Sequence, residues 1–140
     1  MQQQRVSKYL IAATLAFGLV GGAYAQSGLP AVHQQGAVSF VSGGVGQDES
    51  TAFERNEGRW PLALRFTGAG GEFLADVHVS VTDAKGAEVL KTDARGPFML
   101  VKLAPGHYTV QASYSGKVQS RPVTVPAKGG VKEAFSWSAQ

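Results

Sequence analysis

The feature that most constrains the fold is a series of short alternating segments, separated by turn residues, over positions 77–114. Residues 77–82 alternate apolar and polar side chains, as a strand with one buried face does. Asp83-Ala84-Lys85-Gly86 then has the composition of a tight turn, in which Asp bonds the backbone and Gly accepts positive φ. We expect a second turn of the same kind at Asp93-Ala94-Arg95-Gly96 and a third at Ala104-Pro105-Gly106. Strands this short and this regularly interrupted are typical of an antiparallel β-sandwich.

The same alternation extends along the chain in both directions. The expected strands cover residues 37–41, 60–67, 73–82, 88–92, 97–103, 107–114, 118–125 and 131–137. Glycines at 43, 44 and 46 end the first of them, and Asp48 and Glu49 suit the first turn of a helix that ends near Asn56. We therefore predict an all-β fold: a single immunoglobulin-like antiparallel β-sandwich of seven or eight strands, with a short helix before the second strand.

Residues 1–25 have the three parts of a cleavable signal peptide. Arg5 and Lys8 are positive, residues 10–20 are apolar, and Ala23-Tyr24-Ala25 is a small-x-small cleavage site. The apolar run is shorter than the roughly 20 residues that a membrane-spanning helix needs. We expect cleavage after Ala25, a periplasmic location, and no membrane insertion of the processed chain.

The processed chain is expected to be one domain of nearly balanced charge. Residues 26–36 lack periodicity and are predicted to be a flexible N-terminal leader, and residues 37–140 are predicted to be the folded domain. Two of the 13 Lys and Arg residues and none of the 10 Asp and Glu residues lie in the signal segment, which leaves a net charge near +1. Such a chain lacks the clustered basic residues of a nucleic-acid binder. With no cysteine, thiol catalysis and thiolate metal sites are excluded.

The turn and strand residues together resemble the carboxypeptidase regulatory-like domain, a transthyretin-like (prealbumin-like) β-sandwich. The resemblance rests on Val81-x-Asp83-x-x-Gly86, and on Thr92-Asp93-x-x-Gly96-x-Phe98-x-Leu100-x-x-Leu103-x-Pro105-Gly106-x-Tyr108-x-Val110-x-Ala112. It implies that Phe98, Leu100 and Leu103 face the core. The segment 42–53 is similar to one in small exported proteobacterial proteins of this type. In the family the domain is usually an accessory module beside an enzyme or a transporter.

A neighbouring family of transthyretin-like proteins consists of enzymes with a recognisable sequence pattern. Transthyretin-like 5-hydroxyisourate hydrolases end in a Tyr-Arg-Gly-Ser tetrapeptide and use paired histidines. This chain ends in Trp137-Ser138-Ala139-Gln140, so it departs from that pattern. No Gly-x-Ser-x-Gly motif marks a nucleophile either. The residues therefore assign no catalytic site, no cofactor and no metal, and the chain is expected not to be an enzyme.

The candidate interaction segment is the glycine-rich turn and the start of the predicted helix. Its residues are Gly43, Gly44, Gly46, Asp48, Glu49 and Ser50. Loops on a rigid scaffold often carry function, although these acids also suit a helix that caps one end of the sandwich. The acids argue against a phosphate-binding loop.

Two further groups of residues have alternative interpretations. His78 and His107 lie on outward faces of different predicted strands and would form a weak metal site only if those strands pair, whereas His33 lies in the leader. Trp60, Tyr108, Tyr114 and Trp137 would form a carbohydrate-stacking surface only if exposed. The period-two pattern favours a core position for the first three.

Three functions remain open from the sequence. The preferred hypothesis is an exported, non-enzymatic module that binds an unidentified protein or envelope component through residues 43–55 or an exposed sheet edge. The second is a periplasmic protein that binds a small ligand or a metal through His78, His107, Asp48 or Glu49. The third is a hydrolase of transthyretin-like descent.

Overall fold

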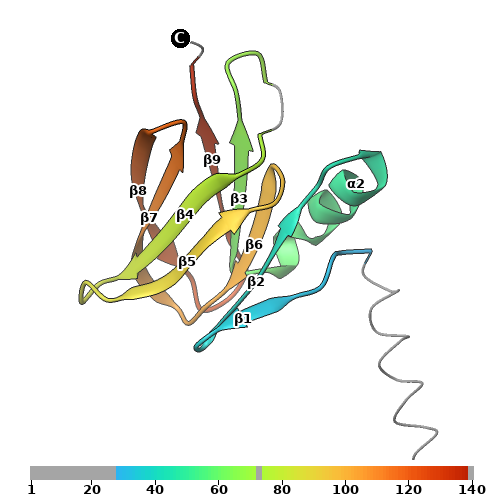
Figure 1. Cartoon of the computed structure of the whole chain (residues 1–140). Coiled ribbons are helices and arrows are strands. Elements are labelled where there is room, and N and C mark those ends of the chain that lie inside the picture. The colour runs from blue at the N-terminus through green and yellow to red at the C-terminus, as the bar shows by residue number, and fades with distance from the viewer. Residues whose placement is uncertain (1–27, 72–73, 139–140) are drawn as a thin grey trace, which may run out of the picture.

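The computed structural model describes residues 28–71 and 74–138, so the predicted signal peptide lies outside the described residues. The elements in chain order are β1 (His33–Gln35), β2 (Val38–Gly43), α2 (Gln47–Asn56), the 3₁₀ helix η1 (Glu57–Arg59), β3 (Leu62–Thr67), β4 (Val77–Asp83), β5 (Glu88–Ala94), β6 (Phe98–Lys102), β7 (Gly106–Tyr114), β8 (Lys117–Val125) and β9 (Val131–Ser136) (Figure 1). Neither helix of the described residues is long and apolar enough to cross a membrane.

The strands form two facing sheets, which confirms the predicted all-β sandwich. One sheet has the order β1-β2-β6-β3-β9 and the other the order β5-β4-β7-β8. Neighbouring strands are antiparallel except β3 and β9, which run parallel. All eight expected strands are present as β2 to β9. The described residues add β1, so the helix precedes the third strand rather than the second.

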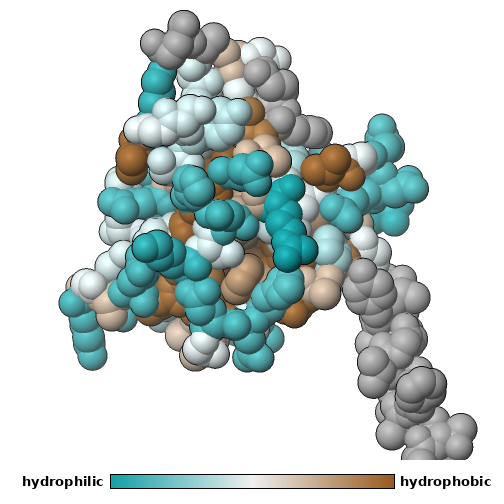
Figure 2. Space-filling model, in the orientation of Figure 1, coloured by the Kyte–Doolittle hydropathy of each residue, from teal (hydrophilic) through white to brown (hydrophobic). Residues whose placement is uncertain are grey.

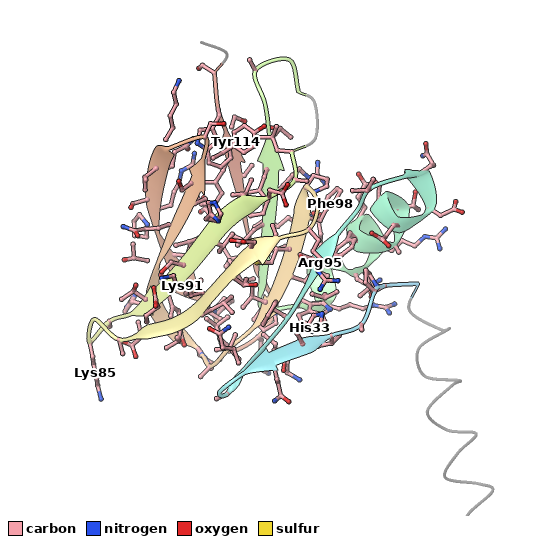
Figure 3. All side chains as sticks on the ribbon, viewed as in Figure 1. His33, Lys85, Lys91, Arg95, Phe98 and Tyr114 are labelled. Atoms are coloured by element: carbon pink, nitrogen blue, oxygen red, sulfur yellow. The ribbon has the colours of Figure 1, made fainter. Side chains whose placement is uncertain are left out.

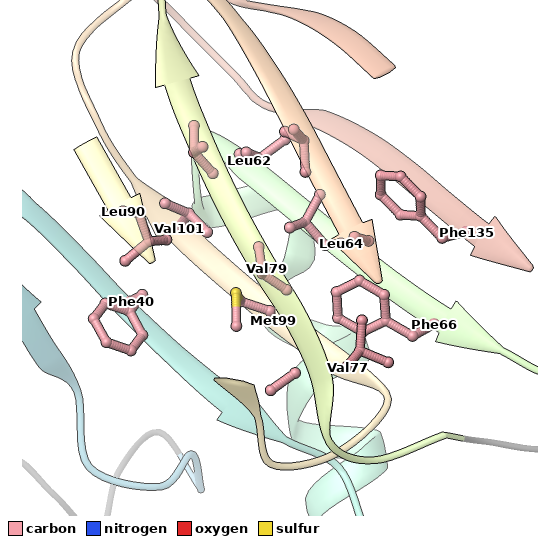
Figure 4. Packing of buried hydrophobic residues seen from close by; sticks show 14 of the residues in the cluster. Phe40, Leu62, Leu64, Phe66, Val77, Val79, Leu90, Met99, Val101 and Phe135 are labelled. Atoms are coloured by element: carbon pink, nitrogen blue, oxygen red, sulfur yellow. The ribbon is translucent and has the colours of Figure 1, made fainter. Parts of the chain in front are cut away.

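The main core lies between the two sheets and is built by alternate residues of each strand. Val77, Val79 and Val81 of β4 are fully buried there and face Leu62 and Leu64 of β3 (Figure 4). Aromatic rings close one end of this core, where Phe66, Phe135 and Trp137 lie with ring centroids 5.9–6.5 Å apart. The period-two pattern of the sequence therefore follows from burial of one face of each strand.

A second core joins α2 to the outer face of the five-stranded sheet. Phe53 of α2 stacks on Phe98 of β6 with ring centroids 5.6 Å apart. Leu29, Val41, Ala52, Ala63 and Leu100 complete this cluster. Phe98 and Leu100 were expected in the same core as Leu103, and this expectation is wrong: they face the helix, whereas Leu103 faces the other sheet. Residues 98–101 form a continuous apolar run because β6 is buried on both faces.

The expected flexible leader over residues 26–36 needs correction for residues 28–36. Leu29 is 6% exposed and packs in the helix core. Residues 33–35 pair with β2 through a tight turn in which Gly36 has φ 60°. A single leucine and one glycine turn are enough to attach this segment, and neither produces a periodic pattern in the sequence.

The two predicted Asp-to-Gly turns differ in the structure. At the first turn, the Asp83 carboxylate accepts hydrogen bonds from the N–H groups of Lys85 and Ala87, at 2.9 and 3.0 Å, and Gly86 has φ 90°. The second prediction is wrong in its chemistry. Asp93 lies within β5, and Gly96 is required because a Cβ at this position would overlap the backbone of Gly43.

Candidate functional site

Part of the predicted interaction segment is used to join β2 to α2. The Gly44 N–H donates to Oε1 of Glu49 at 2.8 Å. A Cβ at Gly44 would overlap the ring of Phe98, and a Cβ at Gly43 would meet the Glu49 carboxylate at 2.5 Å. Both glycines are buried and Glu49 is half-buried. These three residues therefore have a packing role.

The remaining residues of the segment begin the helix. The Ser50 N–H donates to the Gly46 carbonyl at 3.0 Å, and no side chain caps the helix N-terminus. Asp48 is exposed, and Val45 between the glycines is 68% exposed. The exposed part of this segment is therefore residues 45–48.

The histidines do not converge. His78 on β4 lies opposite Ser113 of β7, and His107 lies six positions earlier on β7, opposite Thr124 of β8. At about 3.4 Å per residue this places the two imidazoles roughly 20 Å apart, too far to share a metal ion. His33 contacts the Phe40 ring at the β1 end of the other sheet. Over residues 28–71 and 74–138, no three His, Asp or Glu side chains are grouped as metal ligands.

The aromatic side chains do not form an exposed stacking surface. Trp137 is buried and its indole N–H donates to the Lys117 carbonyl at 2.9 Å. Trp60, Tyr108 and Tyr114 are half-buried against the two cores. The Tyr108 hydroxyl donates to the Ala104 carbonyl at 2.7 Å. Partial burial of the hydroxyl, and secondly the nearby Asp83 carboxylate, raise the pKa of Tyr108.

A hollow of about 700 Å³ lies on the outer face of the four-stranded sheet. This face is crossed by β4 and β5 and is mainly hydrophilic (Figure 2). Figure 3 labels Lys91, one of its side chains, on β5. The residues that line the hollow come from four neighbouring strands: His78, Val79 and Ser80 from β4, Lys91, Thr92 and Asp93 from β5, Gln111 and Ser113 from β7, and Val118 from β8.

The strand register arranges the polar side chains of the hollow in two rows. Asp93, His78 and Ser113 are direct cross-strand neighbours, and so are Lys91, Ser80 and Gln111. Directly opposite residues of antiparallel strands project from the same face. The first row therefore crosses β5, β4 and β7 in that order, and the second row runs beside it two residues further along each strand.

The hydrogen bonds within the hollow leave most of its polar groups facing solvent. His78 Nδ1 lies 2.5 Å from Oδ1 of Asp93, and the two side chains are 66% and 64% exposed. The Ser80 hydroxyl donates to Oε2 of Glu88 at 2.7 Å. The sequence predicted the outward direction of His78 and Ser80. It did not group them with Lys91, Asp93, Gln111 and Ser113, since that step needs the cross-strand register.

Side chains cover part of two of the four sheet edges, on β5 and on β9. Along β5, the Gln35 amide accepts from the Lys91 N–H at 2.8 Å and donates to the Lys91 carbonyl at 3.1 Å. Along β9, Arg121 and Gln119 donate to the carbonyls of Ala134 and Ser136, at 2.5 and 2.6 Å. Backbone groups occupied in this way are not available to an added strand.

Comparison with known proteins identifies the class of domain. The family model of the carboxypeptidase regulatory-like domain matches residues 63–137, from β3 to the residue after β9. The match covers more than half of the chain, and the chain belongs to this family, which confirms the resemblance drawn from residues 81–112. β1, β2 and α2 precede the matched region.

A solved structure entitled "Crystal Structure of S.CueP" is similar at 21% identity and a TM-score of 0.38. The similarity covers 54% of this chain and 59% of that chain, so it spans less than two thirds of the solved structure. No curated protein matches the chain significantly.

Proposed function

We propose that the processed chain is an exported, non-enzymatic binding module of the periplasm, which recognises a protein or an envelope component through the hollow on its four-stranded sheet. The observation that supports this most is the hollow itself. It places polar side chains from β4, β5 and β7 around about 700 Å³ of open space. The other predicted docking elements are engaged in part, Gly43 and Gly44 in packing and the β5 and β9 edges in side-chain hydrogen bonds.

Exposure of the hollow favours recognition over catalysis. Catalytic groups gain most of their effect in sites from which water is excluded, where electrostatic interactions are stronger. The paired side chains of His78 and Asp93 are about two-thirds exposed. Solvated side chains of this kind can form hydrogen bonds with a bound partner, and the rigid sheet beneath holds them in position.

A cross-linked pull-down from the native envelope tests this proposal. The bait is the tagged protein, and the test variant carries Lys91→Glu with Gln111→Arg, which changes charge and volume within the hollow. The matched control carries Lys85→Glu with Gln34→Arg, the same changes at exposed positions outside both the hollow and the segment before α2. We expect one specific partner to be captured by the wild type and the control and lost from the test variant.

Two results would contradict the proposal. One is capture of the same partner, at the same yield, by the hollow variant. The other is loss of the partner from a Val45→Glu, Asp48→Lys variant while the hollow variant retains it, which would place the interaction on the segment before and within α2. Each variant must first show the wild-type melting temperature.

The size of the hollow favours a second candidate, a small-molecule-binding protein. Its volume of about 700 Å³ falls within the roughly 300–1,000 Å³ of small-ligand sites. Native mass spectrometry of protein taken from its own compartment distinguishes the candidates. A bound small mass that disappears in the Lys91→Glu, Gln111→Arg variant would support the small ligand, and its absence beside a captured partner would support the interaction module.

A further inference from the structure

We propose that the hollow binds a neutral, linear, polyhydroxylated chain, a glycan strand of the envelope, which lies across β5, β4 and β7 between the two rows of polar side chains. This inference rests on the proposed function because it takes the same hollow as the binding site. It adds the chemical class of the ligand and its direction across the sheet.

The spacing of the side chains fits a repeating sugar chain. Neighbouring strands are about 4.8 Å apart, close to the length of one pyranose unit, and outward residues of one strand repeat at about 7 Å. A linear glycan at right angles to the strands would therefore place about one sugar over each strand. Its two edges would face the row Asp93, His78 and Ser113 on one side and the row Lys91, Ser80 and Gln111 on the other.

The charges of the hollow favour a neutral ligand. Lys91 supplies one ammonium and Asp93 one carboxylate, and Glu88 adds a second carboxylate beside Ser80. A polyanion would meet both carboxylates, and a polycation would meet the ammonium. A sugar hydroxyl both donates and accepts, so it can donate to Asp93 and accept from Lys91 in hydrogen bonds strengthened by the charge.

The uncharged side chains of the hollow can also bind a chain of sugar hydroxyls. Gln111 offers an amide that donates and accepts, and Ser113 a hydroxyl that does both. Val118, 61% exposed at the β8 side of the hollow, offers an apolar contact for the C–H face of a sugar ring. A peptide cannot add a strand to β4 or β7, nor to β5 at Lys91. β4 and β7 are paired on both sides, and the outer edge of β5 at Lys91 is bonded by Gln35.

The experiment is a titration of the isotope-labelled protein followed by its amide NMR signals. Cellotetraose and chitotetraose are the neutral probes, tetragalacturonate is the anionic probe of equal length, and a Gly-Ser octapeptide is the peptide probe. The variants are His78→Ala and Gln111→Ala, with His107→Ala as the matched control. His107 is an exposed histidine of the same face, outside the hollow.

We expect a neutral tetrasaccharide to shift the amide signals of β4, β5 and β7 around the hollow. Loss of one hydrogen-bonding side chain in either hollow variant should weaken binding about tenfold, while His107→Ala should bind as the wild type does. All variants are compared only after their melting temperatures match that of the wild type.

Several outcomes would overturn the inference, and they separate it from the proposed function. Tighter binding of tetragalacturonate or of the peptide in the hollow would give the ligand another chemistry. The absence of amide shifts with millimolar neutral sugar would also refute the glycan as ligand. If the pull-down nevertheless captures a protein through the hollow, the proposed binding function stands without the glycan. Shifts confined to another face, with no partner lost from the hollow variant, would refute both.

Discussion

At the scale of single residues, two glycines with nearly the same φ angle have different reasons to be glycine. Gly44 has φ 100° and Gly46 has φ 95°, a region that L side chains rarely adopt. A Cβ at Gly44 would also overlap the Phe98 ring, whereas a Cβ at Gly46 would have no atom within 4 Å. Backbone conformation thus constrains both positions, and packing constrains only Gly44.

This difference predicts the result of paired alanine substitutions. Both Gly44→Ala and Gly46→Ala carry the cost of positive φ, so the difference between them isolates the overlap with Phe98. We expect Gly44→Ala to lower the free energy of unfolding by about 1–3 kcal/mol more than Gly46→Ala does. Urea denaturation of both variants measures the difference. Equal stabilities would show that Phe98 moves aside without cost, and the tight packing inferred at this position would be wrong.

Residues also show where local sequence chemistry is informative and where it is not. Asp83 and Gly86 form the turn that their spacing predicts because all its hydrogen bonds lie within five residues. Asp93 and Gly96 have the same spacing, but each is used by a distant partner, Asp93 by His78 and Gly96 by the backbone of Gly43. A local pattern cannot reveal contacts of this kind, since they exist only after the sheets assemble.

At the scale of elements, a side chain can occupy the backbone hydrogen-bonding groups that an edge strand leaves unpaired. β1 has only three residues, yet it places the Gln35 amide beside β5 of the opposite sheet, where it bonds both backbone groups of Lys91. A side-chain amide has the same donor and acceptor as a peptide group. Gln35 therefore acts as a single residue of an absent neighbouring strand and protects this part of the β5 edge.

Removing the Gln35 amide should open this edge. We expect Gln35→Ala to lower stability by about 1 kcal/mol and to accelerate hydrogen exchange at the Lys91 N–H. The matched control is Gln34→Ala, which removes the same side chain from the neighbouring exposed position and should change neither quantity. Amide exchange followed by NMR provides the measurement. Unchanged protection of the Lys91 N–H in Gln35→Ala would show that the edge does not depend on this bond.

The elements were more predictable than the candidate site. Alternation and the bounding turn residues together were enough to predict β2 to β9. Most of these strands bury one face in the main core, whereas β6 is an apolar run buried on both faces. Alternation was not enough for β1, whose three residues are all exposed. The hollow depends on which residue of β4 lies opposite which residue of β5 and β7. The sequence predicted the outward direction of His78, but its neighbours Asp93 and Ser113 follow only from the register.

At the scale of the whole molecule, the five-stranded sheet connects two cores. β6 presents Met99 and Val101 to the opposite sheet, and Phe98 and Leu100 to the helix. Strain or solvent that reaches one face of β6 therefore disturbs the packing of the other, because protein interiors are close-packed. The helix, the five-stranded sheet and the four-stranded sheet are three layers of a single packed unit.

This arrangement predicts that the helix and the sandwich unfold together. Phe53 is fully buried on α2 against Phe98, so Phe53→Ala should lower the free energy of unfolding by about 3–5 kcal/mol. Because β6 belongs to both cores, the transition should remain two-state, with helix and sheet signals lost at the same urea concentration. Val45→Ala, at an exposed position of the preceding turn, is the control and should leave the curve unchanged. If helical signal is lost first while the sheet keeps the wild-type midpoint, α2 is an independent attachment and the two cores are not coupled.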